Sequence, residues 1–258
     1  MTVKTFSYIS SETDNYRSLD LYFSPNANKT SPLVLLVHGG AWRSEDKSDY
    51  QELCQGFVHH GLSVASVNYR LSLKEGENDT PHVQHPTHIH DVGNAVKFLY
   101  ETPPSELYDP KQLYLVGHSA GAHISMMLLL STDMPYHQYI QGIIGVSGIY
   151  DIPLLLEIHP SYADFIVQAF GTDDSVYYDA SPINKKSYIL GNKPVFILQS
   201  SEDTLVDNKQ AERMYSHLQT FHKNIELDLT LTGDHYDIMK TENLLKYIKQ
   251  MLLVNEHT

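Results

Sequence analysis

The stretch that decides the fold of this chain is Leu113-Tyr114-Leu115-Val116-Gly117-His118-Ser119-Ala120-Gly121. Its first four residues form an apolar run typical of a buried strand, and its last five match Gly-x-Ser-x-Gly. Residues 120–130 are rich in Ala, Met and Leu and favour a helix. We therefore predict a strand, a tight turn and a helix, with Ser119 at the turn. Only small residues fit beside a serine in such a turn, which is typical of a nucleophile elbow.

Apolar strand-like runs alternate with helix-length stretches along the rest of the chain, as expected for an α/β fold with a mostly parallel sheet. The predicted strands are 5–9 and 19–23, an edge hairpin, followed by 33–37, 64–69, 113–116, 143–146, 195–199 and 227–231. The predicted helices are 48–60, 88–101, 120–130, 209–218 and 241–253. A chain of 258 residues can bury this core as one unit, so we expect a single domain over 1–258.

Residues 150–193 interrupt this alternation. The segment is rich in aromatic and proline residues and has no strand period. We expect short helices that cap a pocket, because insertions in this architecture lie at the carboxyl ends of the strands, where ligands bind. The alternative is a connection that only packs on the sheet.

Charge and composition limit the classes of partner that the protein can bind. The formal net charge of −13 would repel nucleic acid and anionic membrane surfaces, so we expect neither partner. No apolar run approaches the ~18 residues of a membrane span, and the first twenty residues show no secretory signal. Cys54 is the only cysteine, which precludes an intrachain disulfide and favours a cytoplasmic location. We expect a small-molecule substrate and no cofactor, and the sequence is compatible with a homodimer.

A reactive serine of this type needs an acid that follows it in the chain, at the carboxyl end of a later strand. The loop after strand 195–199 holds Glu202 and Asp203, and Asp207 lies just beyond it. Chain order alone does not rank the three carboxylates. Glu202 and Asp207 are alternatives to Asp203 at this point, and Asp207 could instead cap the next helix.

The base should lie between the last strand and the last helix. His235 occupies this position within Gly233-Asp234-His235-Tyr236-Asp237. The other histidines that we considered are His217, His222 and His257. Asp203 would fix the imidazole tautomer, His235 would take the proton of Ser119, and the serine oxygen would attack an acyl carbonyl. The pattern predicts a serine hydrolase that forms an acyl-enzyme.

Stabilising the negative charge of such an intermediate requires hydrogen-bond donors that are already aimed at it. His38-Gly39-Gly40-Ala41-Trp42 follows the predicted strand 33–37, and its glycines allow main-chain N–H groups to approach a substrate closely. We predict that the N–H groups of Gly39, Gly40 and Ala120 form the oxyanion hole.

Three segments together resemble one branch of the α/β-hydrolase superfamily, which holds small carboxylesterases of the hormone-sensitive-lipase type and the arylformamidases, or kynurenine formamidases. These segments are 38–42 (HGGAW), 68–72 (NYRLS) and 117–123 (GHSAGAH). Further similarity lies in 147–151, 170–171 and 180–182. The resemblance covers most of the chain and implies an α/β-hydrolase fold, with Asp203 as the acid and His235 as the base.

The short segment before the oxyanion loop bears on the size of the substrate. The hormone-sensitive-lipase type often has a longer helical N-terminal cap, whereas only about thirty residues precede strand 33–37 here. We therefore expect a compact substrate, with Trp42, His118 and Tyr150 in contact with it. Small carboxylic esters are the leading class, and N-formylkynurenine is the alternative. A third reading is a non-catalytic ligand-binding relative of these enzymes.

A histidine cluster invites a metal hypothesis. Its members are His82, His85, His88 and His90. Their spacing is loose, and prolines interrupt the loop that holds them, so the tetrahedral geometry of a zinc site is not favoured. We expect no metal site here.

Overall fold

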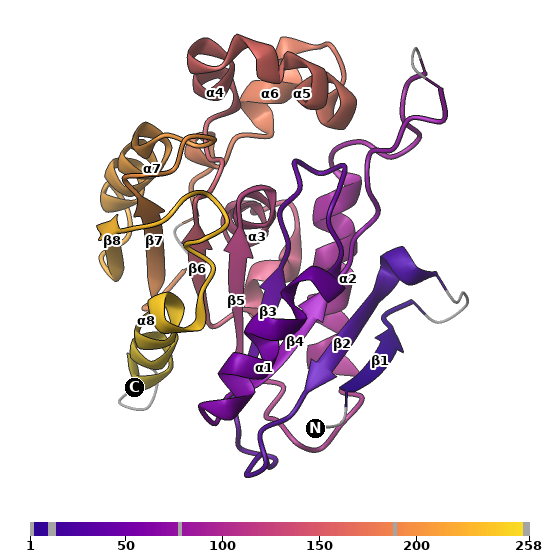
Figure 1. Ribbon diagram of the computed structural model, residues 1–258, viewed down its shortest axis with the longest axis vertical. Helices are drawn as coiled ribbons and strands as arrows, with labels where there is room; N and C mark the ends of the chain where they lie inside the picture. Colours follow the sequence, from indigo (N-terminus) through magenta and orange to yellow (C-terminus); the bar gives the residue numbers. More distant parts are fainter. Residues whose placement is uncertain (1–2, 10–13, 77–78, 188–189, 255–258) are drawn as a thin grey trace.

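A mostly parallel sheet forms the centre of the computed structural model (Figure 1). The structure describes residues 3–9, 14–76, 79–187 and 190–254, and within these ranges eight strands are arranged in the order β1-β2-β4-β3-β5-β6-β7-β8. The strands are β1 (Val3–Ser7), β2 (Ser18–Tyr22), β3 (Leu33–Val37), β4 (Ser63–Val67), β5 (Leu113–His118), β6 (Gly142–Val146), β7 (Val195–Ser200) and β8 (Ile225–Leu231). The predicted α/β-hydrolase class is confirmed.

The direction of the strands changes near one edge of the sheet. Strands β1 and β2 form an antiparallel hairpin, and β2 pairs antiparallel with β4. From β4 to β8 every neighbouring pair is parallel, so these strands end at the same edge of the sheet. The loops that follow β3, β5, β7 and β8 therefore emerge together, and they carry the predicted site residues.

Helices cover both faces of the sheet (Figure 1). The long helices are α1 (Gln51–His59), α2 (Thr87–Glu101), α3 (Ala120–Leu130), α7 (Asn208–Gln219) and α8 (Thr241–Val254). Successive side chains of a strand point to opposite faces. Val34 and Leu36 of β3 accordingly pack in one core cluster with residues of α1 and α8. Leu33 and Leu35 pack in the other cluster with residues of α2, α3 and α7.

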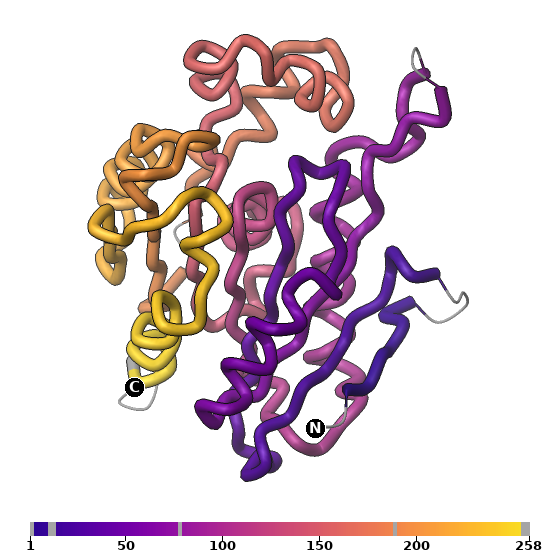
Figure 2. The backbone as a smooth tube through the Cα atoms, in the orientation of Figure 1, coloured from indigo at the N-terminus to yellow at the C-terminus, as the bar shows by residue number. Residues whose placement is uncertain are grey.

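Three short helices form a layer above the carboxyl ends of the strands (Figure 1). They are α4 (Ile152–Ile158), α5 (Ala163–Phe170) and α6 (Asp174–Asp179), and they occupy the predicted insertion 150–193. Arg43, in the loop after β3, is bound to this layer: its Nη1 lies 2.5 Å from Asp164 Oδ2 and 3.0 Å from Gln168 Oε1. Figure 2 shows the loop before α2 running beside the layer, and the N–H of His85 donates to the carbonyl of Ala169.

The predicted elements differ from the observed ones mainly at their ends. The stretch predicted as one helix over 48–60 starts as a 3₁₀ helix, η2 (Lys47–Tyr50), and continues as α1. Asp46 explains this start, because its carboxylate accepts the N–H of Ser48 while Asp49 bonds back to the N–H of Asp46. None of the helices within the described ranges combines the length and the apolar character that a bilayer span requires.

Candidate active site

Ser119 lies at a strained turn between β5 and α3. Its backbone has φ 53° and ψ −115°, a left-handed region that residues with a side chain rarely adopt. A Cβ atom at Gly117 would collide with the carbonyl of Gly121, and one at Gly121 would collide with the carbonyl of Val37. The two glycines are therefore required by close backbone packing, and the turn has the form predicted for a nucleophile elbow.

The side chains of His235 and Asp203 form a hydrogen bond. The distance from His235 Nδ1 to Asp203 Oδ2 is 2.8 Å, and both side chains are almost completely buried. The other oxygen of Asp203 accepts the N–H groups of Leu205 and Val206 at 2.9 and 3.0 Å. Burial alone would raise the pKa of Asp203, but the His235 hydrogen bond and charge and these two amides hold it at about 2. Asp203 is therefore an anion at neutral pH.

The three carboxylates that chain order left open have different environments. Glu202 accepts the N–H of Gly233 at 2.6 Å. Asp207 accepts the N–H of Lys209 at 2.9 Å and caps α7. Of the three, only Asp203 is hydrogen-bonded to His235.

The oxyanion loop, the elbow and the His235 loop converge around Ser119. The ring of His118, the residue before the serine, lies 4.7 Å from the His235 ring between centroids. A Cβ atom on Gly39 would lie 3.2 Å from the Cβ of Ser119, which places the loop after β3 directly beside the serine. Ser119 has no hydrogen bond to His235 among the described residues; such contacts commonly tighten only when substrate binds.

One of the predicted oxyanion donors has a partner within the protein. The N–H of Gly39 donates to Glu45 Oε2 at 3.0 Å, so it is already occupied inside the protein. The loop has positive φ at Gly40 (78°), Ala41 (49°) and Trp42 (59°), which turns its peptide planes one after another. Among the loop and turn hydrogen bonds of the described chain, none uses the N–H of Gly40, Ala41 or Ala120. The geometry therefore favours these three donors.

The three residues predicted to contact substrate are all buried. Trp42, His118 and Tyr150 have 0% exposed surface, so none of them is accessible to a substrate in this structure. Trp42 donates from Nε1 to His123 Nδ1 at 3.3 Å and packs edge-on against Phe170 of the cap. The Tyr150 ring fills the space left open by two glycines, Gly145 and Gly148. His118 contributes to the site by holding the main chain of His235.

Sequence reasoning missed two residues beside the site, Glu45 and Tyr50. The Tyr50 hydroxyl lies 2.9 Å from Glu45 Oε2 and 2.9 Å from His118 Nδ1. A cavity of about 480 Å³ is lined by both, together with Tyr236 next to the base. No local pattern in the sequence pairs a glutamate with a tyrosine five residues later, so only the fold reveals this contact.

The histidine cluster does not assemble. His88 is buried and lies 2.9 Å from the hydroxyl of Ser72, whereas the side chain of His82 is 87% exposed. Within the described ranges, no group of three or more His, Cys, Asp or Glu side chains is placed to hold a metal ion.

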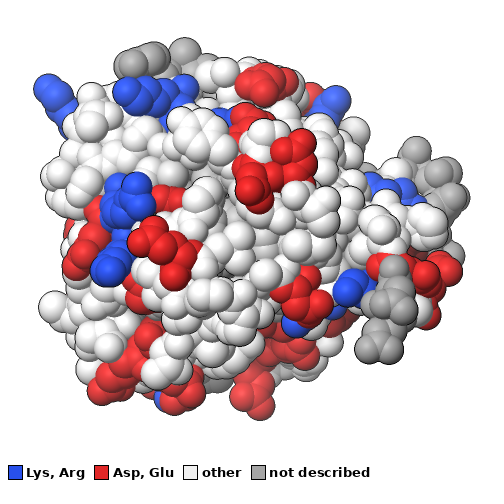
Figure 3. Space-filling model, turned by 90° about the horizontal axis from the view of Figure 1, so that it is seen from above, with Lys and Arg blue, Asp and Glu red and all other residues white. Residues whose placement is uncertain are grey.

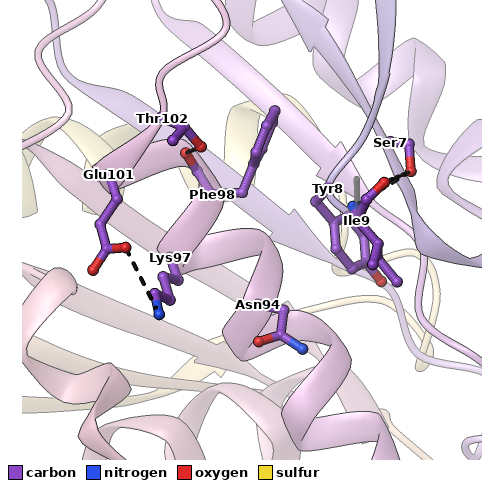
Figure 4. A pocket seen from close by; sticks show the side chains of 8 residues that line it. All are labelled: Ser7, Tyr8, Ile9, Asn94, Lys97, Phe98, Glu101 and Thr102. Atoms are coloured by element: carbon purple, nitrogen blue, oxygen red, sulfur yellow. Dashed lines mark hydrogen bonds and ion pairs between the residues drawn. The ribbon is translucent and has the colours of Figure 1, made fainter. Parts of the chain in front are cut away.

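Acidic and basic side chains are distributed differently over the capped end of the molecule. Figure 3 looks onto this end and shows several acidic groups, one of them close to the middle of the face, whereas basic side chains lie mostly toward its edges. A separate groove of about 430 Å³ lies between the β1 edge and α2, lined by Tyr8, Phe98 and Lys97 among others (Figure 4). None of the predicted site residues lines that groove.

Comparisons with known proteins agree with this geometry. The chain is 29% identical to a kynurenine formamidase from Meyerozyma guilliermondii over 94% of this chain and 92% of that protein. It is 26% identical to a kynurenine formamidase-like hydrolase from Fusarium equiseti, over 89% and 87% of the two chains. Esterase B from Lactobacillus rhamnosis, with a bound inhibitor, has a similar fold: the TM-score is 0.80 at 18% identity, over 99% of this chain and 88% of that one.

A family model also matches most of the chain. The BD-FAE model matches residues 19–218, which span β2 to α7 and include Ser119 and Asp203. Because this match covers well over half of the chain, the protein belongs to the BD-FAE family of the α/β-hydrolase type.

Proposed function

We propose that this protein is a serine hydrolase that transfers a small acyl group from an aryl formamide or a short carboxylic ester to Ser119 and then to water. The observation that carries the proposal is the 2.8 Å bond between His235 and a buried, ionised Asp203, in the loops next to a strained Ser119. This arrangement supports acyl transfer, because it prepares a base for a serine hydroxyl.

The proposed reaction uses these residues in order. Asp203 accepts a hydrogen bond from Nδ1–H of His235, so the lone pair of Nε2 is free to take the proton of Ser119. The serine oxygen attacks the carbonyl carbon, and the resulting oxyanion receives the N–H groups of Gly40, Ala41 and Ala120. His235 then protonates the leaving amine or alcohol. A water molecule attacks the acyl-enzyme by the same steps and releases the acid.

The burial of the nucleophile favours a compact acyl group. Ser119 is only 6% exposed, between a buried His118 and a buried Ala120, which leaves little room for a long acyl chain. The relatives that align over most of this chain are named kynurenine formamidases, and this favours N-formylkynurenine, whose acyl group is a formyl. Short carboxylic esters are the second candidate class, and they use the same catalytic groups.

A kinetic comparison tests the proposal. We would measure kcat/KM of the wild type and of Ser119→Ala on N-formylkynurenine and on p-nitrophenyl acetate. The expected result is a loss of several orders of magnitude in Ser119→Ala on both substrates. A wild-type preference for the formamide of ~100-fold, about 2.7 kcal/mol of transition-state discrimination, would identify an arylformamidase. A preference for the ester would identify a carboxylesterase.

The matched control is Ser216→Ala, because Ser216 is exposed on α7 and, within the described part of the chain, its hydroxyl donates only to the carbonyl of Glu212 one turn earlier. This variant should keep wild-type rates. Near-normal rates in a folded Ser119→Ala would exclude acyl transfer to this serine. No hydrolysis of either substrate by a folded wild type would instead revive a ligand-binding role.

A further inference from the structure

A chain of hydrogen bonds, partly buried at Glu45 and buried at His118, joins the oxyanion loop, the elbow and the loop of the base. We propose that Glu45 and Tyr50 are positioning residues that hold His118, and through it the main chain of His235, and that they do so only while the carboxyl group of Glu45 carries a proton. This proposal rests on the proposed function, since it assigns a task beside the same Ser119.

Four contacts define the chain. The N–H of Gly39 lies 3.0 Å from Glu45 Oε2, and the hydroxyl of Tyr50 lies 2.9 Å from the same oxygen. That hydroxyl also lies 2.9 Å from Nδ1 of His118. On the other side of the ring, Nε2 of His118 lies 2.9 Å from the main-chain oxygen of His235. Three segments that the reaction needs are thus connected through three side chains, Glu45, Tyr50 and His118.

The positions of the protons follow from counting donors. The main-chain oxygen of His235 can only accept, so Nε2 of His118 must carry the hydrogen. A neutral imidazole has one N–H, so Nδ1 of His118 is an acceptor, and the Tyr50 hydroxyl must donate to it. This uses the single hydrogen of Tyr50. The remaining contact, between Tyr50 and Glu45, then requires a hydrogen from the Glu45 carboxyl group.

Two further observations agree with this count. Burial is the main cause that lowers the pKa of His118 to about 3, so a doubly protonated His118 is not available to supply the hydrogen instead. The second oxygen of Glu45, Oε1, is buried and has no hydrogen-bond partner among the described residues, which is a costly place for an ionised carboxylate and a cheaper one for a neutral acid. Burial also raises the pKa of Glu45, against the lowering by Tyr50 and the Gly39 amide.

Loss of the Glu45 proton would break the chain. An ionised Glu45 would draw the Tyr50 hydrogen to itself, and Nδ1 of His118 would lose its donor. If His118 changed tautomer to restore that contact, it would release His235 instead. The titratable groups around Glu45 are Asp49, Tyr50, Glu52, Tyr69, His118, His235 and Tyr236. Among them Asp49 raises the pKa of Glu45, and a charged His235 lowers it.

The test compares pH profiles of kcat and KM for the wild type, Glu45→Gln, Glu45→Ala and Tyr50→Phe, over about pH 5 to 10. With its amide nitrogen in the place of Oε2, glutamine can still donate to Tyr50, although it cannot accept the Gly39 N–H as the acid oxygen does, whereas alanine supplies neither contact. We expect Glu45→Gln to keep at least about tenfold more kcat than Glu45→Ala and to lack the alkaline decrease of the wild type. Tyr50→Phe should lower kcat more than it raises KM. Equal kcat in the Gln and Ala variants, or an unchanged alkaline decrease in Glu45→Gln, would overturn the proposal.

A second measurement does not depend on turnover. In the wild type labelled with ¹³C at the glutamate carboxyl carbon, the Glu45 signal is identified by its loss in Glu45→Gln and followed by NMR against pH. We expect the shift of a neutral acid at neutral pH. The shift of a carboxylate at pH 6 would refute the protonated state even if Ser119 proved essential. If Ser119→Ala kept full activity while Glu45 was protonated, only the proposed function would fail.

Discussion

Replacing Asp203 by asparagine keeps the shape of the side chain and changes only its hydrogen-bonding pattern. The N–H groups of Leu205 and Val206 both point at Oδ1, so they fix the asparagine carbonyl in that position. The amide nitrogen must then occupy the place of Oδ2, which faces His235 Nδ1 at 2.8 Å and Gln199 Nε2 at 3.1 Å. An N–H group would therefore donate to His235 where the carboxylate now accepts.

The consequence is the wrong imidazole tautomer. With Nδ1 acting as an acceptor, the single hydrogen of a neutral His235 moves to Nε2, which can no longer take the proton of Ser119. The amide also loses the negative charge that stabilises the imidazolium in the transition state. We expect kcat to fall by ~10⁴-fold, about 5.4 kcal/mol of transition-state stabilisation.

The assay is kcat at saturating substrate at neutral pH, with circular dichroism as the check of folding. Glu202→Gln is the matched control, because an amide oxygen can still accept the N–H of Gly233, and its kcat should stay within about twofold of the wild type. A folded Asp203→Asn that lost less than about tenfold would refute the assignment of Asp203 as the acid. An equal loss of kcat in Glu202→Gln would show that the effect is not specific to Asp203.

The remaining predictions concern packing and stability. Gly121→Ala places a methyl group against the carbonyl of Val37, so the free energy of unfolding should fall by ~1–3 kcal/mol in thermal unfolding, and activity should be much lower. An unchanged Tm would contradict the close packing. Trp42→Phe leaves His123 Nδ1 without its donor inside the core, so stability should fall by ~1–3 kcal/mol while KM stays the same; a large rise in KM would restore Trp42 as a substrate contact. The pKa of Asp203 is held at about 2 against an ordinary 3.8, so its ionised form contributes about 2.5 kcal/mol of stability above pH ~4 and loses it as the pH falls toward 2. Denaturant titrations at pH 2 to 6 should show this decrease in the wild type and a smaller one in Asp203→Asn, and identical curves would exclude it.

Most of the fold can be predicted from the sequence, because short sequence patterns identify its strands and helices. A buried parallel strand is a short apolar run, as in β3 and β5, and the runs are separated by stretches long enough for a helix. Ser119 was equally predictable, since strand, glycines and helix follow one another within eighteen residues. Chain order places His235 and the loop of Asp203 each after a strand, and the resemblance to the α/β-hydrolase branch selects Asp203 among the three carboxylates.

The remaining details depend on contacts between distant segments. The N–H of Gly39 is occupied because Glu45 folds back on it, and no spacing rule contains that information. Trp42 and Tyr150 are amphipathic aromatics that the sequence allows either on a pocket wall or in the core. Trp42 lies in the core because it packs against helix α5, and Tyr150 lies there because its ring fills the space beside the glycines of β6 and the loop after it.

Helix α3 has a further consequence, for how the molecule folds and loses activity. All eleven of its residues are buried, so no face of the helix is suited to water. Such a helix gains nothing from forming before the sheet and the surrounding helices are in place. Its amides should exchange with solvent only through global opening, at the slowest rates in the protein. Because Ser119 is the N-cap residue of this helix, inactivation and global unfolding should follow one and the same transition.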